Sequence, residues 1–187
     1  CIPHLLSCIL LKPSDHPVNA MTTKDDEKLS MEFCGMRFDT PLVLLSGCVG
    51  FGEEYTRVEG FSNRDVGAVC LKGTTLEPRL GNAPHRIYET PDGMLNAIGL
   101  QNPGARYVVD TILPTLGFEE TRFIANIAGS TVEEYAEVAR IFDDSPVDAI
   151  EIKEPNQDGN GQAPAKECPQ CQAVIHAAYS ICPDCGW

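Results

Sequence analysis

The stretch RFIANIAGSTVEEYAEVARIFDDSPVDAIEIK, residues 122–153, decides the fold. Its two ends, residues 122–130 and 147–153, are apolar runs with the length and composition of buried strands. Between them, apolar residues recur at helical spacing at Val132, Tyr135, Ala136, Val138 and Ala139. Ser130 or Thr131 can cap this helix at its start. A helix between two buried strands predicts an α/β protein with a parallel sheet built from βαβ units.

Two further apolar runs extend this sheet toward the N-terminus. Residues 67–75 (GAVCLKGTT) and the continuous run at 42–45 both predict buried strands. Before them, the segment that begins at Met31 alternates in polarity and turns at Gly35, which predicts a short hairpin leading into the first buried strand.

Composition limits the classes of partner. Fourteen Lys and Arg against 27 Asp and Glu give a net charge of -13, which repels nucleic-acid backbones and anionic membranes. No apolar run reaches the roughly 18 residues that span a bilayer. With 43% hydrophobic residues, disorder of the whole chain is excluded. We therefore expect no membrane contact, and nucleic acid is a poor candidate for a partner. Nine cysteines, four paired in CxxC spacing and five scattered singly, are typical of a reducing cytoplasm and not of a disulfide framework.

The two ends of the chain differ in composition from its middle. Residues 1–30 are expected to be a disordered or artefactual leader, and a signal peptide at CIPHLLSCILL is the alternative, although it lacks a basic start. Residues 155–166 (PNQDGNGQAPAK) have the composition of a flexible linker.

The tail, residues 167–187, carries paired cysteines in two CPxC turns. Two such turns that face each other form a tetrahedral site of four thiolates, which suits Zn²⁺. The predicted ligands of this zinc ribbon are Cys168, Cys171, Cys182 and Cys185. Two disulfides or an iron site are the alternatives. His176 lies between the turns and is not needed as a ligand, because four cysteines already complete the shell.

Polar residues follow the predicted strands, at the edge where parallel sheets place their functional groups. Lys72 ends one strand, where its ammonium can stabilise an anion in a partly dry pocket, or simply extend to solvent. Between the second and third strands, Asn96, Gln101 and Asn102 lie in the Gly-rich segment ETPDGMLNAIGLQNPG and offer donors and acceptors to a planar heterocycle. The alternative is an ordinary polar loop.

Three segments resemble a known family: SGCVGFGEEY, GAVCLKGTTLEPRLGNAPHRIYETPDGMLNAIGLQNPG and NIAGSTVEEYAEVAR. From about residue 31 to residue 151, the chain resembles the N-terminal half of a class 1 dihydroorotate dehydrogenase, most of all the catalytic subunit of the NAD-linked two-subunit type. The resemblance implies that residues 31–154 form the first half of a TIM (β/α)8 barrel, since a complete barrel needs about 250 residues.

That family uses FMN to oxidise dihydroorotate to orotate in pyrimidine biosynthesis. The resemblance therefore implies that the flavin would be contacted by Ser46, Lys72, Gly73 and Asn126. It implies that dihydroorotate would be contacted by Lys72, Asn96, Ala97, Ile98, Gly99 and Leu100. It further implies an iron-sulfur flavoprotein subunit for electron transfer as a partner.

The resemblance ends at the fourth strand. There the family has a segment of the form ELNISCPN, whose Asn binds flavin and substrate and whose Cys is the catalytic base. This chain reads Glu151-Ile152-Lys153-Glu154-Pro155-Asn156, two residues shorter and without a cysteine. No catalytic base is therefore assigned. Glu154 is the one candidate to replace it, and the shortened loop argues against its correct placement.

The sequence thus predicts a dihydroorotate dehydrogenase-like half-barrel joined to a zinc ribbon, truncated and inactive alone. A half-barrel leaves the inner face of its sheet uncovered and two sheet edges open, so we expect self-association. The alternatives are a noncatalytic zinc-ribbon interaction protein on a remnant scaffold, and one half of a split enzyme.

Overall fold

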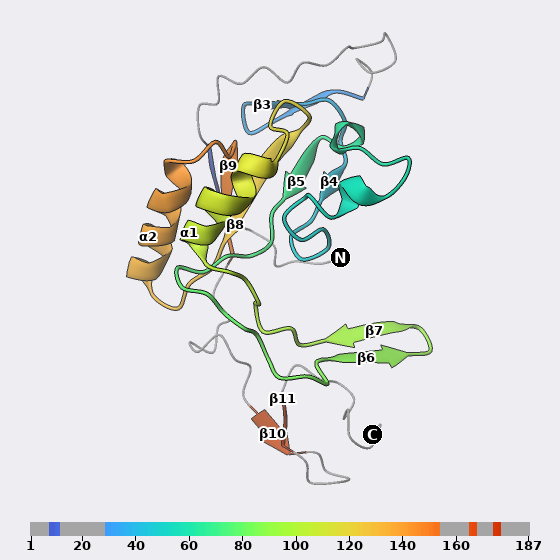
Figure 1. Ribbon diagram of the computed structural model, residues 1–187, viewed down its shortest axis with the longest axis vertical. Helices are drawn as coiled ribbons and strands as arrows, with labels where there is room; N and C mark the ends of the chain where they lie inside the picture. The colour runs from blue at the N-terminus through green and yellow to red at the C-terminus, as the bar shows by residue number, and fades with distance from the viewer. Residues whose placement is uncertain (1–7, 12–28, 154–164, 168–173, 177–187) are drawn as a thin grey trace.

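The computed structural model describes residues 8–11, 29–153, 165–167 and 174–176 (Figure 1). Its main sheet has the strand order β1-β9-β8-β5-β4. The strands are β1 (Cys8–Leu11), β4 (Val43–Leu44), β5 (Ala68–Cys70), β8 (Arg122–Ile127) and β9 (Ala149–Ile152). Strands β4, β5, β8 and β9 are parallel, and β1 pairs antiparallel with β9. The parallel sheet predicted from the sequence is confirmed.

Helix α2 (Val132–Asp143) connects β8 to β9, as the apolar spacing predicts. Thr131 is its N-cap, and the Thr131 side chain accepts a hydrogen bond of 3.1 Å from the backbone N–H of Glu134. This bond satisfies one of the free N–H groups of the first turn.

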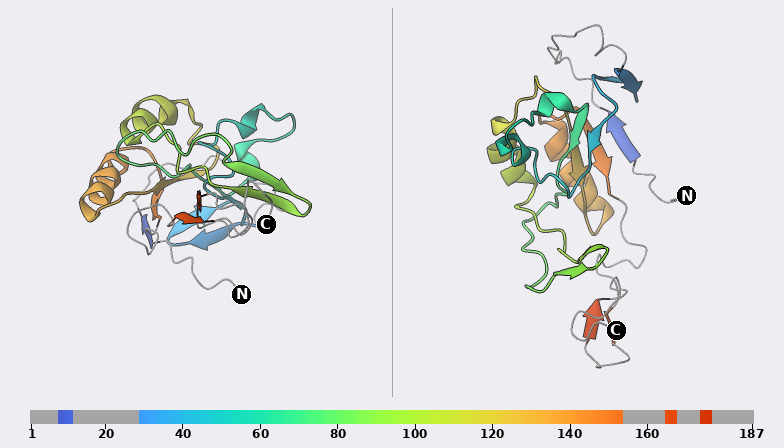
Figure 2. Two further views of the ribbon diagram at one scale, coloured as in Figure 1. Left: turned by 90° about the horizontal axis from the view of Figure 1, so that it is seen from below. Right: turned by 90° about the vertical axis from the view of Figure 1, so that its right-hand side faces the viewer.

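The connection from β5 to β8 ends in a run of short helices. It contains α1 (Ala105–Tyr107), the π-helix η4 (Val108–Ile112) and the 3₁₀ helix η5 (Leu113–Thr115). Two 3₁₀ helices, η2 (Tyr55–Arg57) and η3 (Asn63–Asp65), lie between β4 and β5. Helices α1 and α2 lie side by side against the sheet (Figures 1 and 2).

The larger core lies between these helices and one face of the sheet. The sheet contributes the buried side chains of Val69, Leu71, Phe123, Ala125, Ile127 and Ile150. Helix α2 contributes Val138, Ile141 and Phe142. Each strand supplies every second residue to this core, so the residues between them face the opposite side.

The opposite face is partly covered by a hairpin of β2 (Met31–Phe33) and β3 (Met36–Phe38), which turns at Gly35 as predicted. Met36 and Phe38 pack there in a second core with Ala68, Cys70, Ile124 and Ala149. The hairpin lies at the end of the sheet where the parallel strands begin (Figure 1).

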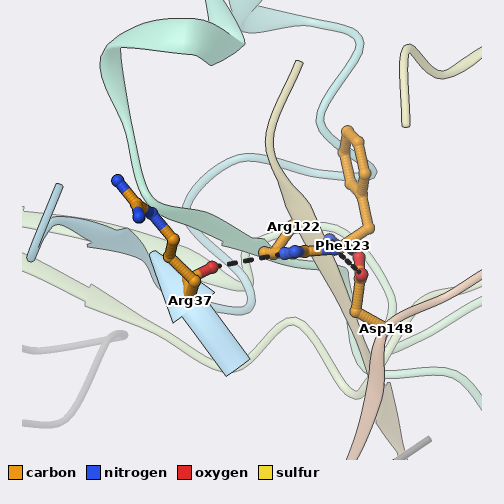
Figure 3. Close-up of polar contacts among 4 residues, drawn as sticks. All are labelled: Arg37, Arg122, Phe123 and Asp148. Carbon is orange, nitrogen blue, oxygen red and sulfur yellow. Dashed lines mark hydrogen bonds and ion pairs between the residues drawn. The ribbon is translucent and has the colours of Figure 1, made fainter. Parts of the chain in front are cut away.

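Arg122 joins this hairpin to the sheet by a hydrogen bond and also forms an ion pair within the sheet (Figure 3). Arg122 Nη1 lies 2.8 Å from Asp148 Oδ1, and these side chains are only 11% and 3% exposed. Asp148 Oδ2 accepts a second bond, of 2.9 Å, from the backbone N–H of Phe123, while Arg122 Nε donates to the carbonyl of Arg37 at 3.3 Å. Asp148 therefore fixes the start of β8 against the start of β9.

Strand β1 falls within the segment expected to be a leader, and it covers an edge that the sequence predicts to be open. Its register pairs Cys8 with Ile152 and Leu11 with Ala149. The physical reason is that an edge strand presents a row of N–H and C=O groups, which an extended segment of the same chain can satisfy.

Two further hairpins form separate two-stranded sheets. Strands β6 (Ile87–Thr90) and β7 (Gly93–Asn96) form the first, on the side where the parallel strands end (Figure 1). Strands β10 (Ala165–Glu167) and β11 (Val174–His176) form the second. Within the described ranges, no helix is long and apolar enough to cross a membrane.

Candidate functional site

The candidate site lies on the sheet face opposite the helices, where the parallel strands end. Because Val69 and Leu71 point into the larger core, Cys70 alternates to the other face of β5. The same alternation puts Asn126 of β8 and Glu151 of β9 on that face. Asn126 and Glu151 are also direct neighbours in the register of the two strands.

These three side chains form a hydrogen-bonded group, which we call the carboxylate cluster. Glu151 Oε2 accepts a bond of 2.6 Å from Asn126 Nδ2 and one of 2.7 Å from Cys70 Sγ. Asn126 is 6% exposed and Cys70 is also buried. The cluster links three neighbouring strands through a single carboxylate oxygen.

The sequence prediction includes Asn126 but misses Glu151 and Cys70. Cys70 and Glu151 could have been predicted from the alternation of side chains along each strand, because it places all three residues on the same face of the sheet.

The cluster holds Cys70 as a neutral thiol. Burial raises the pKa of Cys70 far above its ordinary value, and the hydrogen bond and negative charge of Glu151 raise it further. A backbone hydrogen bond with Ser46 acts in the opposite direction, but more weakly. Cys70 therefore serves as a hydrogen-bond donor and not as a thiolate nucleophile.

Two predicted flavin contacts, Gly73 and Asn126, lie together with Leu100 of the predicted substrate segment. A Cβ atom at Gly73 would lie 2.9 Å from Asn126 Oδ1 and 3.1 Å from Leu100 Cδ1, so only glycine fits without a shift. The backbone N–H of Thr74 donates to the Asn126 carbonyl at 2.9 Å and fixes this approach.

The other two predicted flavin contacts lie at the ends of neighbouring strands. Ser46 follows β4, is half-buried and bonds to Cys70 through its backbone. Lys72 follows β5 and is also half-buried, and its backbone N–H donates to the Gly50 carbonyl at 2.8 Å. Lys153, which stands where the family has a ligand-binding Asn, is exposed after β9.

The segment after β7 is held by side chains of its own connection. Asn82 donates to the Ala97 carbonyl through Nδ2, at 2.7 Å, and to the Ile98 carbonyl through its backbone N–H, at 2.9 Å. Leu100 has a φ of 56°, a left-handed conformation that costs a non-glycine residue about 1–2 kcal/mol. Asn102 Nδ2 donates to the Leu100 carbonyl at 2.8 Å and holds this conformation.

Asn102 and Gln101 bond within the loop itself, which agrees with the alternative of an ordinary polar loop. Buried Asn102 accepts bonds from the backbone N–H groups of Thr75 (3.2 Å) and Gly104 (2.9 Å). Gln101 Oε1 accepts from Arg86 Nη2 at 2.6 Å. Asn96 lies exposed at the end of β7, with no hydrogen bond to the strand ends in the part of the chain that the structure describes.

The predicted zinc ligands Cys168, Cys171, Cys182 and Cys185 and the candidate base Glu154 all lie outside the described residues. Among the residues that are described, no group of three or more His, Cys, Asp or Glu side chains could hold a metal ion.

A parallel sheet with βα connections and polar groups at its carboxyl edge is found both in TIM barrels and in open α/β folds. A model of the dihydroorotate dehydrogenase family matches residues 28–176, which is most of the chain. The chain therefore belongs to the dihydroorotate dehydrogenase family.

Similar proteins agree with this assignment. The chain is 49% identical over 126 residues to the catalytic subunit of dihydroorotate dehydrogenase B (NAD(+)) of Anoxybacillus flavithermus, a match that covers 67% of this chain and 40% of that protein. The corresponding proteins of Geobacillus kaustophilus and Listeria monocytogenes are 50% and 46% identical over the same length. The chain thus spans about 40% of the length of these relatives. A solved structure of DHODH from Eimeria tenella, in complex with ferulenol, aligns with a TM-score of 0.47 at 22% identity, over 63% of this chain and 35% of that one.

The described residues fit the ring system of the flavin that is typical of this family. Gly73 is buried, and Asn126 Oδ1 and Leu100 Cδ1 occupy the direction in which a Cβ atom would point, so glycine at this position lets both side chains approach the end of β5. Asn126 Oδ1 lies next to Gly73 and is a hydrogen-bond acceptor. Lys72, which precedes Gly73 in the chain, is half-buried and carries a cationic side chain.

Proposed function

We propose that this chain is the first half of a (β/α)8 barrel derived from an FMN-dependent dihydroorotate dehydrogenase of pyrimidine biosynthesis, with residues 31–154 as the half-barrel. The observation that supports this most is the close approach of Gly73, Asn126 and Leu100 at the carboxyl edge of the sheet. It joins two predicted flavin contacts to the predicted dihydroorotate segment in a chain of this family.

In this proposal FMN supplies the hydride acceptor, and the residues of this chain bind and orient. Lys72 would help to hold the flavin and would supply a positive charge that stabilises negative charge on it. Ser46, Gly73 and Asn126 complete the contact with the flavin. The segment from Asn96 to Leu100 binds dihydroorotate with its backbone N–H groups and the Asn96 amide.

The test is an FMN titration followed by flavin fluorescence. We expect binding far weaker than that of a complete relative, and Gly73→Ala should weaken it further because the added Cβ would collide with Asn126 Oδ1. Gly93→Ala is the matched control, since a Cβ at Gly93 meets nothing within 4 Å. Equal affinity of Gly73→Ala and wild type for FMN would contradict the proposal that Gly73 lies at the flavin site.

We further propose that the chain alone does not oxidise dihydroorotate, because the segment after β9 has no cysteine to act as base. Assays with added FMN and an artificial electron acceptor should stay at background. Activity that disappears on Glu154→Gln would instead assign the base to Glu154. An iron-sulfur flavoprotein subunit remains the proposed electron-transfer partner of an active assembly.

A second proposed function, a zinc-ribbon interaction module, is supported by the paired CPxC motifs. The first motif, with Cys168 and Cys171, lies between β10 and β11, and these strands pair antiparallel. Such a hairpin can present two thiolates in one turn, and a second turn with Cys182 and Cys185 would complete a four-thiolate zinc site. This module would act without catalysis, on the remaining half-barrel as a scaffold.

Metal analysis tests the ribbon. Because binding free energy of a structural zinc is also folding free energy, we expect about one zinc per chain, lost on Cys182→Ser. Trp187 is the sole tryptophan, so a chelator should change its emission. Metal-free protein after purification under reducing conditions would favour disulfides.

A further inference from the structure

We propose that Glu151 is a positioning residue that fixes the orientation of the Asn126 amide, so that the site presents an acceptor, Asn126 Oδ1, and selects a ligand with a ring N–H donor. The choice of ligand rests on the proposed function, whereas the orientation of the amide rests on the carboxylate cluster alone.

The chemistry of the two groups determines the orientation. An ionised carboxylate has only acceptor oxygens, so Glu151 Oε2 can bind the NH₂ end of Asn126 and not its oxygen. The 2.6 Å contact from Asn126 Nδ2 is short, as expected of a bond to a charged acceptor. A flip of the amide would bring two oxygens together in a buried place, which is unfavourable.

Cys70 strengthens this arrangement. Its thiol donates to the same Oε2 atom at 2.7 Å, and burial keeps the thiol protonated. Both neighbours donate to the same oxygen, so Glu151 Oε2 acts as the acceptor in two bonds.

The amide oxygen of Asn126 therefore faces Gly73. Asn126 Oδ1 lies 2.9 Å from the position of a Cβ at Gly73, and within the described ranges it accepts no hydrogen bond. A ligand that reaches Asn126 Oδ1 would find an acceptor there, at a strand end that half-buried Lys72 and Gly73 follow. These groups suit an imide-like ring, in which an N–H lies next to a carbonyl oxygen that can carry negative charge.

The experiment measures the Asn126 amide directly, by NMR of the ¹⁵N-labelled full chain. The resonance is assigned by its loss in Asn126→Asp. We expect Glu151→Gln to shift it strongly, because glutamine can face either end of the amide. Asp148→Asn is the matched control: it alters a buried carboxylate next to the same strand but leaves the Asn126 resonance in place. An Asn126 resonance that does not change in Glu151→Gln overturns the proposal.

A titration with FMN then tests the ligand. Glu151→Gln should weaken binding about tenfold, the loss of one oriented hydrogen bond, whereas Asp148→Asn should leave affinity unchanged despite its cost in stability. A shifted resonance with unchanged affinity for FMN overturns the positioning role. If the wild-type chain binds no FMN at all, the proposed function fails, and the NMR result alone decides whether Glu151 orients Asn126.

A double variant tests the carboxylate cluster by a measurement of stability, independently of ligand binding. Asn126→Asp places two carboxylates against each other and should destabilise the chain, and the double change Asn126→Asp with Glu151→Gln restores one donor and one acceptor. Recovery of stability in the double variant supports the cluster, and additive losses overturn it.

Discussion

Asp148 combines two roles in one buried side chain, because it pairs with Arg122 and also accepts a bond from the backbone N–H of Phe123. Replacing this carboxylate removes the charged partner of the buried Arg122 side chain and weakens the acceptor of the Phe123 N–H. Asp148→Asn should therefore lower the free energy of unfolding by about 2–4 kcal/mol in urea denaturation.

The matched control for this prediction is an ion pair on the surface. Glu137 and Arg140 lie 3.0 Å apart on α2, and both are exposed. Glu137→Gln should change stability by less than about 0.5 kcal/mol. Similar losses in the two variants would show that burial does not determine the contribution of Asp148.

Cys70 gives a prediction about pH. Its pKa in the fold is raised far above the ordinary value of 9.0, mainly by burial. Below pH 9 the thiol is protonated in both the folded and the unfolded chain, so its contribution to stability is constant and fully present. Above pH 9 the unfolded chain releases this proton and the folded chain does not, so stability falls as pH rises, by about 1.4 kcal/mol per pH unit.

The measurement compares the pH dependence of unfolding in wild type and Cys70→Ser. The serine variant keeps a donor to Glu151 but does not ionise in this range, so the difference between the two slopes belongs to Cys70. In the folded protein, exposed Cys34 and Cys48 should react with iodoacetamide well before Cys70. Equal slopes, or early modification of Cys70, would contradict its assignment as a neutral donor.

At the scale of elements, the connection between β5 and β8 depends on Asn102. Its buried amide bonds to Thr75, Leu100 and Gly104, three points along that connection. Asn102→Ala leaves the buried N–H groups of Thr75 and Gly104 without an acceptor, and we expect a loss of about 2–4 kcal/mol.

Hydrogen exchange should localise this effect. Amides of residues 97–104 should lose protection, while those of β8 keep theirs. Gln101→Ala is the control: Gln101 bonds to Arg86 from an exposed position, so a much smaller change is expected. Uniform loss of protection across the sheet would mean that Asn102 supports the whole fold and not one connection.

The elements that the sequence predicts well are those with a local pattern. The helix spacing and the Thr131 cap predict α2, and apolar runs predict β4, β5, β8 and β9, each within a few residues. The pair β6 and β7 is missed, although Asp92-Gly93 is a strong hairpin signal, because the segment reads as a ligand loop. Strand β1 could not be predicted, because its partner lies far along the chain.

The same contrast holds for the site. Family resemblance identifies Gly73 and Asn126, and the structure brings them together. It does not identify Cys70 or Glu151, because a hydrogen bond between side chains 81 residues apart leaves no local pattern. Residue type alone leaves open whether Asn102 contacts a ligand or its own loop, since a buried amide can bond to either, and the structure shows its bonds to the loop backbone.

At the scale of the whole molecule, β1 determines which edge of the sheet is exposed. It covers β9, so the remaining edge is β4, where Leu42, Val43 and Leu45 are exposed. Deleting residues 1–11 should uncover the edge of β9 and increase self-association, measured by analytical ultracentrifugation. Deleting residues 1–7 keeps β1 and is the control.

The salt dependence of self-association distinguishes pairing through a sheet edge from nonspecific aggregation. The net charge of -13 repels a second copy, so association through either edge should strengthen as salt screens the charges. A monomer of the shorter chain at every salt concentration would contradict an edge-protecting role for β1.

The pairing of β1 with β9 also affects the order of events during synthesis. Within the main sheet β1 comes earliest in the chain, and Ile152, the register partner of Cys8, is made 144 residues after Cys8 (152 − 8). At about 5–20 residues per second, this interval lasts about 7–30 s. During that time the nascent β1 segment has no native partner, whereas β4 and β5 can already pair with each other. The first strand to be translated is therefore the last to join the sheet.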